Sequence, residues 1–197
     1  MKIRTGMALA LAGCAVAWTG PSRAQEQAYT VDPGHTFPTY TIEHFGVSLQ
    51  QGRFDSTQGR IVLNPAAKTG SVEIVIQTAS ISTGLASLDR KLRSEDFFDA
   101  ARNPQIVYRA SNVRFADDQP VALEGELTMH GVTRPLTLEV SRFRCTLHPL
   151  AGGKRCGALA RGTVRRSDYD LGRYKPPLLG DEVELTITVE ATLDTKG

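Results

Sequence analysis

Hydrophobic and polar residues alternate along several segments of this chain. In residues 183–191 every second side chain is apolar, and Glu or Thr occupies the positions between. Val72, Ile74 and Ile76 form a similar apolar face. Because successive side chains of a strand point to opposite faces, each pattern predicts a β-strand with one buried and one wet face. A wet face favours antiparallel over parallel sheet.

Shorter segments of the same kind complete a set of about eight strands. We expect them over residues 39–44, 59–63, 105–111, 121–129 and 135–143, with a further hairpin whose arms flank residues 148–153. Pro, Gly, Asn and Asp separate the segments, as they do in turns. Short antiparallel strands in this number predict an all-β fold, either a barrel or a sandwich. A closed barrel of eight strands leaves space inside for packed side chains or for one small ligand.

One segment is predicted to be helical. Between Ser87 and Phe98, Leu88 and Leu92 stand four residues apart among charged residues, so they share one face of a helix. Asn103 and Pro104 end the region before the next strand. A single short helix is therefore expected.

The first 24 residues have the pattern of a secretory signal peptide, which leaves residues 25–197 as the folded domain. Lys2 and Arg4 precede an apolar stretch over residues 7–18 that is too short to span a bilayer, and small residues precede position 25. This pattern predicts export. Residues 11–14 also resemble a lipobox, so a lipoprotein anchored at Cys14 is the alternative. The apolar residues that continue beyond Cys14 favour the ordinary signal peptide.

Removal of the signal peptide changes the charge of the chain. The full sequence has 23 basic and 21 acidic residues, and residues 1–24 contain three of the basic ones and no acid. The mature chain therefore has 20 basic and 21 acidic residues, and no excess of positive charge predicts nucleic-acid binding. Nucleophile elbows and phosphate-binding loops are also missing from the sequence. We therefore predict no enzymatic activity and no cofactor.

Two cysteines remain after residue 24. Cys145 and Cys156 are separated by ten residues, and export places them in an oxidising compartment, so we expect a disulfide between them. Closing so short a loop contributes about 2–3 kcal/mol in the chain-entropy model. Two free thiols are the alternative.

The histidines do not have the spacing of a zinc site. His35, His44 and His130 have no acidic or cysteine partner at a metal-binding interval. His130 and Gly131 are predicted to form a hairpin turn in which the glycine takes a positive φ. His44 is in phase with Tyr40 and Ile42, so it is either a polar group of the interior surface or a core histidine with its hydrogen bonds satisfied.

Several motifs, in chain order, resemble those of the YceI-like family of periplasmic proteins. They are Tyr29–Thr36, Tyr40–Gly46, Gln51–Phe54, Leu88–Asp99, Leu123–Pro135 and Arg165–Tyr169. The resemblance implies a lipocalin-like, eight-stranded antiparallel barrel with one short helical segment over one side. It also implies a tunnel that binds a polyisoprenoid, such as a polyprenyl pyrophosphate or an isoprenoid quinone, without catalysis. Two features depart from the family pattern: Lys91 stands where relatives often have histidine, and many relatives lack the cysteine hairpin.

The alternation and the resemblance together predict the lining of this tunnel. The expected ligand-binding residues are Tyr40, Ile42, His44, Phe54, Ile74, Ile76, Phe97, Phe98, Ile106, Tyr108, Leu127, Leu138, Leu185 and Ile187. Arg93 and Arg166 fall in family-like motifs and are the expected contacts of a head group. Without the resemblance, the same apolar residues are equally consistent with a packed core.

The predicted function is that of a periplasmic carrier for a long-chain isoprenoid lipid. Its expected partners are the lipid or quinone and, transiently, a membrane surface, whereas assembly as a homodimer stays open. Two alternatives remain: a structural or stress-response barrel with a filled core, and a small-molecule enzyme that uses His44.

Overall fold

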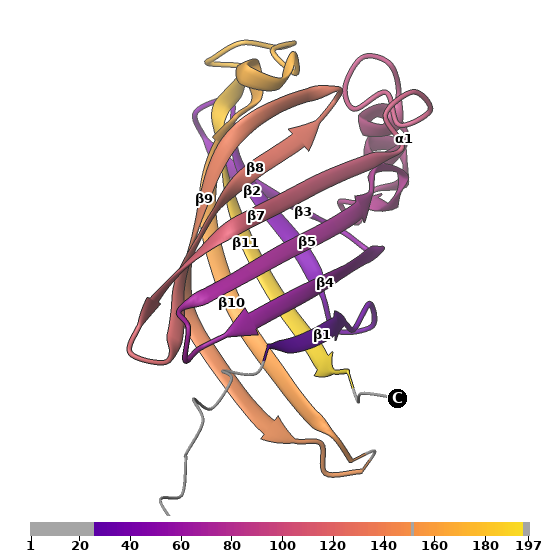
Figure 1. Ribbon diagram of the computed structural model, residues 1–197. Coiled ribbons are helices and arrows are strands. Elements are labelled where there is room, and N and C mark those ends of the chain that lie inside the picture. Colours follow the sequence, from indigo (N-terminus) through magenta and orange to yellow (C-terminus); the bar gives the residue numbers. More distant parts are fainter. Residues whose placement is uncertain (1–25, 151, 195–197) are drawn as a thin grey trace, which may run out of the picture.

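The computed structural model describes residues 26–150 and 152–194, which form a β-barrel with one short α-helix (Figure 1). The signal peptide that we predict for residues 1–24 lies outside the described residues, and so does Cys14, the anchor of the alternative lipoprotein. Among the described residues, no helix is long and apolar enough to cross a membrane.

Eleven strands follow one another along the described chain, with one α-helix and two short 3-10 turns. The strands are β1 (Gln27–Val31), β2 (Phe37–His44), β3 (Ser48–Phe54), β4 (Thr57–Asn64), β5 (Thr69–Gln77), β6 (Ile81–Ser82), β7 (Gln105–Ala116), β8 (Gln119–Met129), β9 (Val132–Leu147), β10 (Lys154–Arg165) and β11 (Leu179–Leu193). The helix is α1 (Ala86–Arg93), and the 3-10 turns are η1 (Thr78–Ser80) and η2 (Arg166–Tyr169).

Eight of the strands close into an antiparallel barrel, as predicted. Their order is β1–β4–β5–β7–β8–β9–β10–β11, and β11 pairs with β1 to close the ring. The three extra strands β2, β3 and β6 extend the wall from β11. The alternation did not predict β3, because five of its seven residues are polar or glycine.

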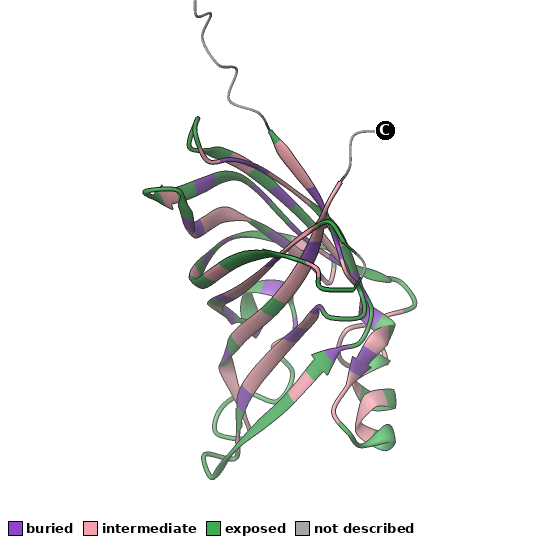
Figure 2. Cartoon of the chain, turned by 90° about the horizontal axis from the view of Figure 1, so that it is seen from below, coloured by how far each residue is buried: buried purple, intermediate pink, exposed green. Residues whose placement is uncertain are grey.

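Two apolar clusters occupy opposite ends of the barrel. The smaller one packs buried residues of β1, β4, β7, β10 and β11 at the end from which the β9–β10 hairpin projects. Its members are Tyr29, Leu63, Val113, Cys156 and Ala191. The larger cluster lies at the end near α1, and Ile61 and Leu123 pack against both clusters. Figure 2 shows the buried and exposed positions along the strands of the wall.

The β8–β9 hairpin has the predicted turn. His130 and Gly131 both have positive φ angles, 53° and 77°, which is the requirement of a type I′ turn. The Nδ1 atom of His130 lies 3.1 Å from the carbonyl oxygen of Tyr169, so the turn also contacts η2.

The helix is shorter than predicted. We expected it over residues 87–98, but α1 ends at Arg93, because Ser94 takes an extended conformation and its hydroxyl donates to the carbonyl of Lys91 at 2.7 Å. The next residues form turns, in which the amide of Phe98 donates to the carbonyl of Leu92 at 3.0 Å. The segment after Arg93 therefore continues over the barrel as a series of turns and not as a helix.

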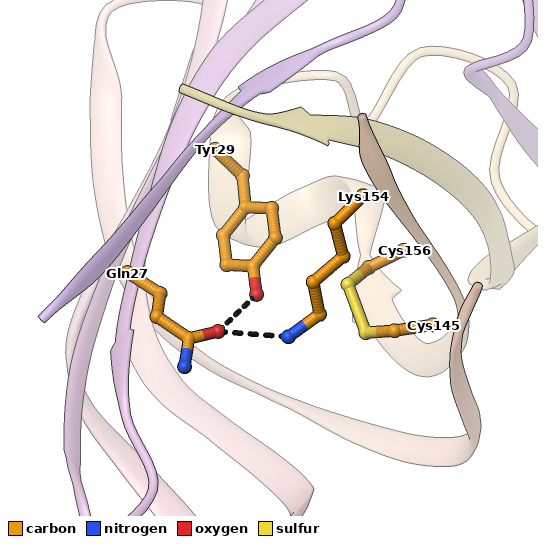
Figure 3. Close-up of a disulfide and its surroundings, with 5 residues drawn as sticks. All are labelled: Gln27, Tyr29, Cys145, Lys154 and Cys156. Carbon is orange, nitrogen blue, oxygen red and sulfur yellow. Dashed lines mark hydrogen bonds between the residues drawn. A yellow bond between two sulfur atoms is a disulfide. The ribbon is translucent and has the colours of Figure 1, made fainter. Parts of the chain in front are cut away.

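The predicted disulfide between Cys145 and Cys156 is confirmed. The two residues are direct cross-strand partners in β9 and β10. Beside them, the side chain of Gln27 accepts hydrogen bonds from Tyr29 Oη at 2.6 Å and from Lys154 Nζ at 2.9 Å (Figure 3). Strand β1 and the hairpin are therefore joined at the packed end of the barrel.

Reduction of the disulfide is expected to lower the free energy of unfolding by about 2–3 kcal/mol, because the unfolded chain regains the entropy of an open loop. Denaturant unfolding of the oxidised and reduced protein measures the difference. The double variant Cys145→Ser, Cys156→Ala is the control and must not respond to reductant. Equal stability of the oxidised and reduced wild type would contradict the prediction.

Candidate ligand-binding cavity

The barrel is hollow at the end near α1. A cavity of about 680 Å³ lies there, within the range of about 300–1,000 Å³ that ligand pockets typically have. Its wall comes from β2, β3, β5 and the strands from β7 to β11, and its cover comes from α1 and from residues 94–98 and 166–178.

Alternate residues of the strands form the wall. For example, Ile74 and Ile76 of β5 face the cavity, and so do Leu185 and Ile187 of β11. All the side chains that we predicted to line the interior are part of this wall: Tyr40, Ile42, His44, Phe54, Ile74, Ile76, Phe97, Phe98, Ile106, Tyr108, Leu127, Leu138, Leu185 and Ile187. Their place in the wall is thus observed, whereas their contact with a ligand stays a prediction.

Several wall residues were missed. Val183 continues the alternation of β11 and Met129 that of β8, so periodicity was sufficient to find them. Leu171 and Leu178 lie in irregular segments, where no periodic pattern indicates which side chains point inward.

The helical segment forms a lid over the cavity; we use this name for residues 86–99. Leu88 and Leu92, whose spacing predicted a shared face of the helix, both line the cavity. Phe98 meets Phe54 of β3 edge to face, with ring centroids 5.9 Å apart, and Phe54 in turn lies 6.4 Å from the ring of Tyr40. The lid is therefore anchored on the wall by aromatic contacts.

A second segment, residues 166–180, crosses the same end of the barrel, and we call it the strap (Figure 1). Its organising group is the buried guanidinium of Arg166, which donates hydrogen bonds to five backbone carbonyls. The acceptors are Leu171, Arg173, Tyr174, Leu179 and Gly180. A guanidinium has five N–H donors, so none is left over. The head-group role of Arg166 stays a prediction, but these contacts favour a role in holding the strap.

The lid and the strap meet at the mouth of the cavity. The ring of Phe97 stacks on that of Tyr174 with centroids 5.8 Å apart, and Lys91 Nζ lies 4.9 Å from the centroid of Tyr174. Arg173 forms an ion pair with Asp96 beside them. Hydrogen bonding by Lys91 lowers the pKa of Tyr174. Cations and aromatic rings thus join two segments that are far apart in the sequence.

The cation that lines the cavity on the lid is Lys91 rather than Arg93. Arg93 is not part of the wall; it donates to the carbonyl of Ile81 at 3.2 Å and lies 4.0 Å from Asp89. The head-group role predicted for Arg93 therefore has no support from its position. Lys91 follows Leu88 by three residues, so the two side chains share one face of the helix. This spacing was the sequence signal for the contribution of Lys91 to the wall.

Two tyrosines of the wall differ in their hydrogen bonding. The hydroxyl of Tyr108 lies within hydrogen-bonding distance of two backbone carbonyl oxygens, that of Leu123 at 2.9 Å and that of Leu136 at 3.2 Å. The hydroxyl of Tyr40 has no hydrogen-bond partner among the described residues. Burial, and secondly the charge of Asp89, raises the pKa of Tyr40 to about 12, so this hydroxyl is neutral at physiological pH.

One group of candidate metal ligands occurs in the described part of the chain, away from the cavity wall. It contains Asp32, His35 and Glu190. Nη1 of Arg155 lies 2.9 Å from Asp32 and 3.2 Å from Glu190, so one arginine already pairs with both carboxylates. The group is an ion-pair cluster, and hydrogen bonding with His35 lowers the pKa of Asp32.

A closed antiparallel barrel with an apolar cavity under a lid defines the class of β-barrel binding proteins. More narrowly, the chain belongs to the YceI-like family, because the family profile of the YceI-like domain matches residues 29–191. Protein YceI of Escherichia coli O17:K52:H18 is 35% identical over 159 residues, which cover 79% of this chain and 81% of the relative.

Solved structures agree with this fold. A Campylobacter jejuni YceI protein superposes with a TM-score of 0.66 at 25% identity and covers 79% of this chain and 91% of its own. A polyisoprenoid-binding domain from Saccharophagus degradans superposes with a TM-score of 0.64 at 18% identity, with coverage of 85% and 99%.

Replacement of Arg166 by methionine is expected to lower the free energy of unfolding by about 3 kcal/mol, because buried carbonyls lose charged hydrogen-bond donors. Denaturant unfolding measures the loss, and hydrogen exchange should locate it in the strap. Arg165→Met is the matched control: Arg165 is 64% exposed and pairs with Asp181, so its loss should cost less than about 1 kcal/mol. Equal losses in the two variants would refute the organising role of Arg166.

Proposed function

We propose that this protein is a periplasmic binding and carrier protein that holds a long-chain isoprenoid lipid, such as a quinone or a polyprenyl pyrophosphate, in the barrel cavity. The observation that carries the proposal is an apolar cavity that is open at one end of the barrel, while a packed cluster fills the other end. The similarity to a domain described as polyisoprenoid-binding supports the same class of ligand.

The energetics indicate how such a carrier selects its ligand. Removing a chain of about forty carbons from water gains roughly 30 kcal/mol at 0.8 kcal/mol per methylene, more than the ceiling of about 18–21 kcal/mol for non-covalent binding. The chain starts in a membrane, however, where it is already out of water. Its transfer is therefore nearly neutral in apolar burial, so cavity shape and contacts to the polar end must provide the selectivity.

Binding is better supported than the two alternatives. A filled structural barrel conflicts with a cavity of about 680 Å³. An enzyme based on His44 would need a group that orients the imidazole, but the contact described for this ring is the edge-on ring of Phe45 at 4.1 Å. No described carboxylate pairs with His44, and burial raises the pKa of Tyr40 and of Tyr108, which keeps these two hydroxyls of the wall neutral.

The periplasmic location rests on two features of the chain. The first is the signal-like pattern of residues 1–24. The second is the cross-strand disulfide, which persists in oxidising compartments.

Replacement of Ile74 or Ile187 by tryptophan is expected to abolish uptake of an added isoprenoid quinone, because the larger ring occupies the cavity. Native mass spectrometry measures the bound lipid. Glu73→Trp and Thr188→Trp are the matched controls, since these neighbours are exposed and point away from the cavity. Uptake in the cavity variants would show that the ligand binds elsewhere, and lipid-free protein that takes up neither quinone nor polyprenol would exclude the function.

The mouth also supports the transient membrane contact that we propose for loading. Exposed large apolar side chains come from the β2–β3 hairpin, the start of α1 and the strap: Phe45, Val47, Leu49, Leu85, Tyr174 and Leu178. The amide of Phe45 donates to the carbonyl of Leu178 at 3.1 Å, so hairpin and strap adjoin. Because four of these residues also line the cavity, its apolar surface continues outward to a rim that suits a lipid interface.

The double variant Phe45→Ser, Leu178→Ser is expected to lose co-sedimentation with ligand-free phospholipid vesicles, because the rim then has less apolar area to insert. Leu147→Ser, Leu150→Ser removes exposed leucines from the β9–β10 hairpin and should bind vesicles like the wild type. Equal binding of both variants would exclude contact through the rim. A concentration-dependent dimer that only the first variant loses would instead assign the rim to a homodimer.

A further inference from the structure

Two tyrosine hydroxyls in the cavity wall have opposite hydrogen-bond states. Tyr108 is satisfied within the barrel by the carbonyls of Leu123 and Leu136. Tyr40 contributes to the same wall, and its hydroxyl has no partner among the described residues. A ligand that fills the cavity would withdraw this half-buried hydroxyl from water, and polar groups that are withdrawn from water normally have a partner. An unpartnered hydroxyl in a ligand cavity is therefore suited to a hydrogen bond with the ligand.

The position of Tyr40 is well determined by its neighbours. Tyr40 of β2 is the cross-strand partner of Gly52 in β3, and its ring lies across this glycine. A Cβ atom at position 52 would be 2.4 Å from the Tyr40 hydroxyl oxygen and 2.5 Å from Cζ, so a larger residue there would displace the Tyr40 ring. The ring of Phe54 packs at 6.4 Å on the same side. The hydroxyl is thus pre-positioned rather than free to search for a partner.

The charges around Tyr40 disfavour an anion. The carboxylate of Asp89 accepts hydrogen bonds from the amide and hydroxyl of Thr83, at 2.8 and 2.7 Å, and its negative charge acts on the phenol. Arg93, at 4.0 Å from Asp89, offsets this charge only in part and points to the carbonyl of Ile81. Lys91 is engaged with the rings at the mouth.

We propose that Tyr40 is a specificity-determining residue that donates a hydrogen bond to a neutral acceptor, such as the carbonyl of a quinone, and thereby favours carbonyl-bearing isoprenoids over phosphorylated ones. The inference rests on the proposed function and specifies the polar end of the ligand. A carbonyl needs one donor to replace its water. A diphosphate near Tyr40 would lose its hydration for one neutral donor beside a fixed carboxylate, and the loss is not compensated.

The test compares three ligands of equal chain length: an isoprenoid quinone, the corresponding polyprenyl diphosphate and the parent hydrocarbon. Competition binding to the wild type should favour the quinone at least tenfold over the diphosphate. Tyr40→Phe should weaken quinone binding about tenfold and leave hydrocarbon binding unchanged. Infrared spectra of the bound quinone add a structural readout, since the carbonyl band shifted by the hydrogen bond should return toward its free position in this variant.

Tyr108→Phe is the matched control, because it removes one hydroxyl from the same wall. It should retain the preference for quinone over diphosphate, whatever its effect on stability. Equal loss of quinone affinity in the two variants, or an unshifted carbonyl band in the wild type, would overturn the role of Tyr40. Tighter binding of the diphosphate than of the quinone would also overturn this role. If Lys91→Gln then lost the diphosphate binding, selection would take place at the mouth. Failure of all three ligands to bind would overturn the proposed function itself, and this inference with it.

Discussion

The pairing of β11 with two successive partners is the constraint on which the rest of the molecule depends. One edge of β11 pairs with β10 along most of its length, whereas the other pairs with β1 at Ala191–Leu193 and with β2 from Leu179 to Thr188. At the change of partner, the backbone of Glu190 bonds to the amide of Asp32 and to the hydroxyl of Thr36, which is almost fully buried. The backbone groups at this point of β11 therefore have hydrogen-bond partners. The wall can divide there without leaving backbone N–H or C=O groups unpaired.

This division explains why one barrel has a packed end and a hollow end. At the packed end the wall closes through β1, and the side chains of Tyr29, Leu63 and Val113 meet across the interior. At the other end β2 and β3 are added beside β11, so more strands surround the interior. Side chains of the same size no longer meet, and lid and strap cover the remaining opening. The same kind of apolar wall therefore forms a packed cluster at one end and a cavity at the other, because the distance across the barrel differs.

Polar groups at a few positions hold the cover of an otherwise apolar cavity. The charge of Arg166 organises the strap through backbone carbonyls, and Lys91 joins the strap to the lid through aromatic rings. A carrier needs a cover that is held by few contacts, since its ligand must also leave. In the function that we propose, the polar groups of the wall decide among ligands with similar hydrocarbon chains, for which apolar burial hardly discriminates.

The sequence by itself determined the all-β fold, the disulfide, the β8–β9 turn and the inward face of the strands, because these depend on local alternation and turn chemistry. Ile74 and Ile187 were assigned to the interior on this basis, and the family motifs indicated a binding barrel. Only the tertiary structure decided that the interior is hollow, since alternation shows which side chains point inward but not how far away the opposite wall lies. It also decided the roles of Arg166 and Lys91 and the unpartnered state of the Tyr40 hydroxyl, because these depend on groups that meet from distant parts of the chain.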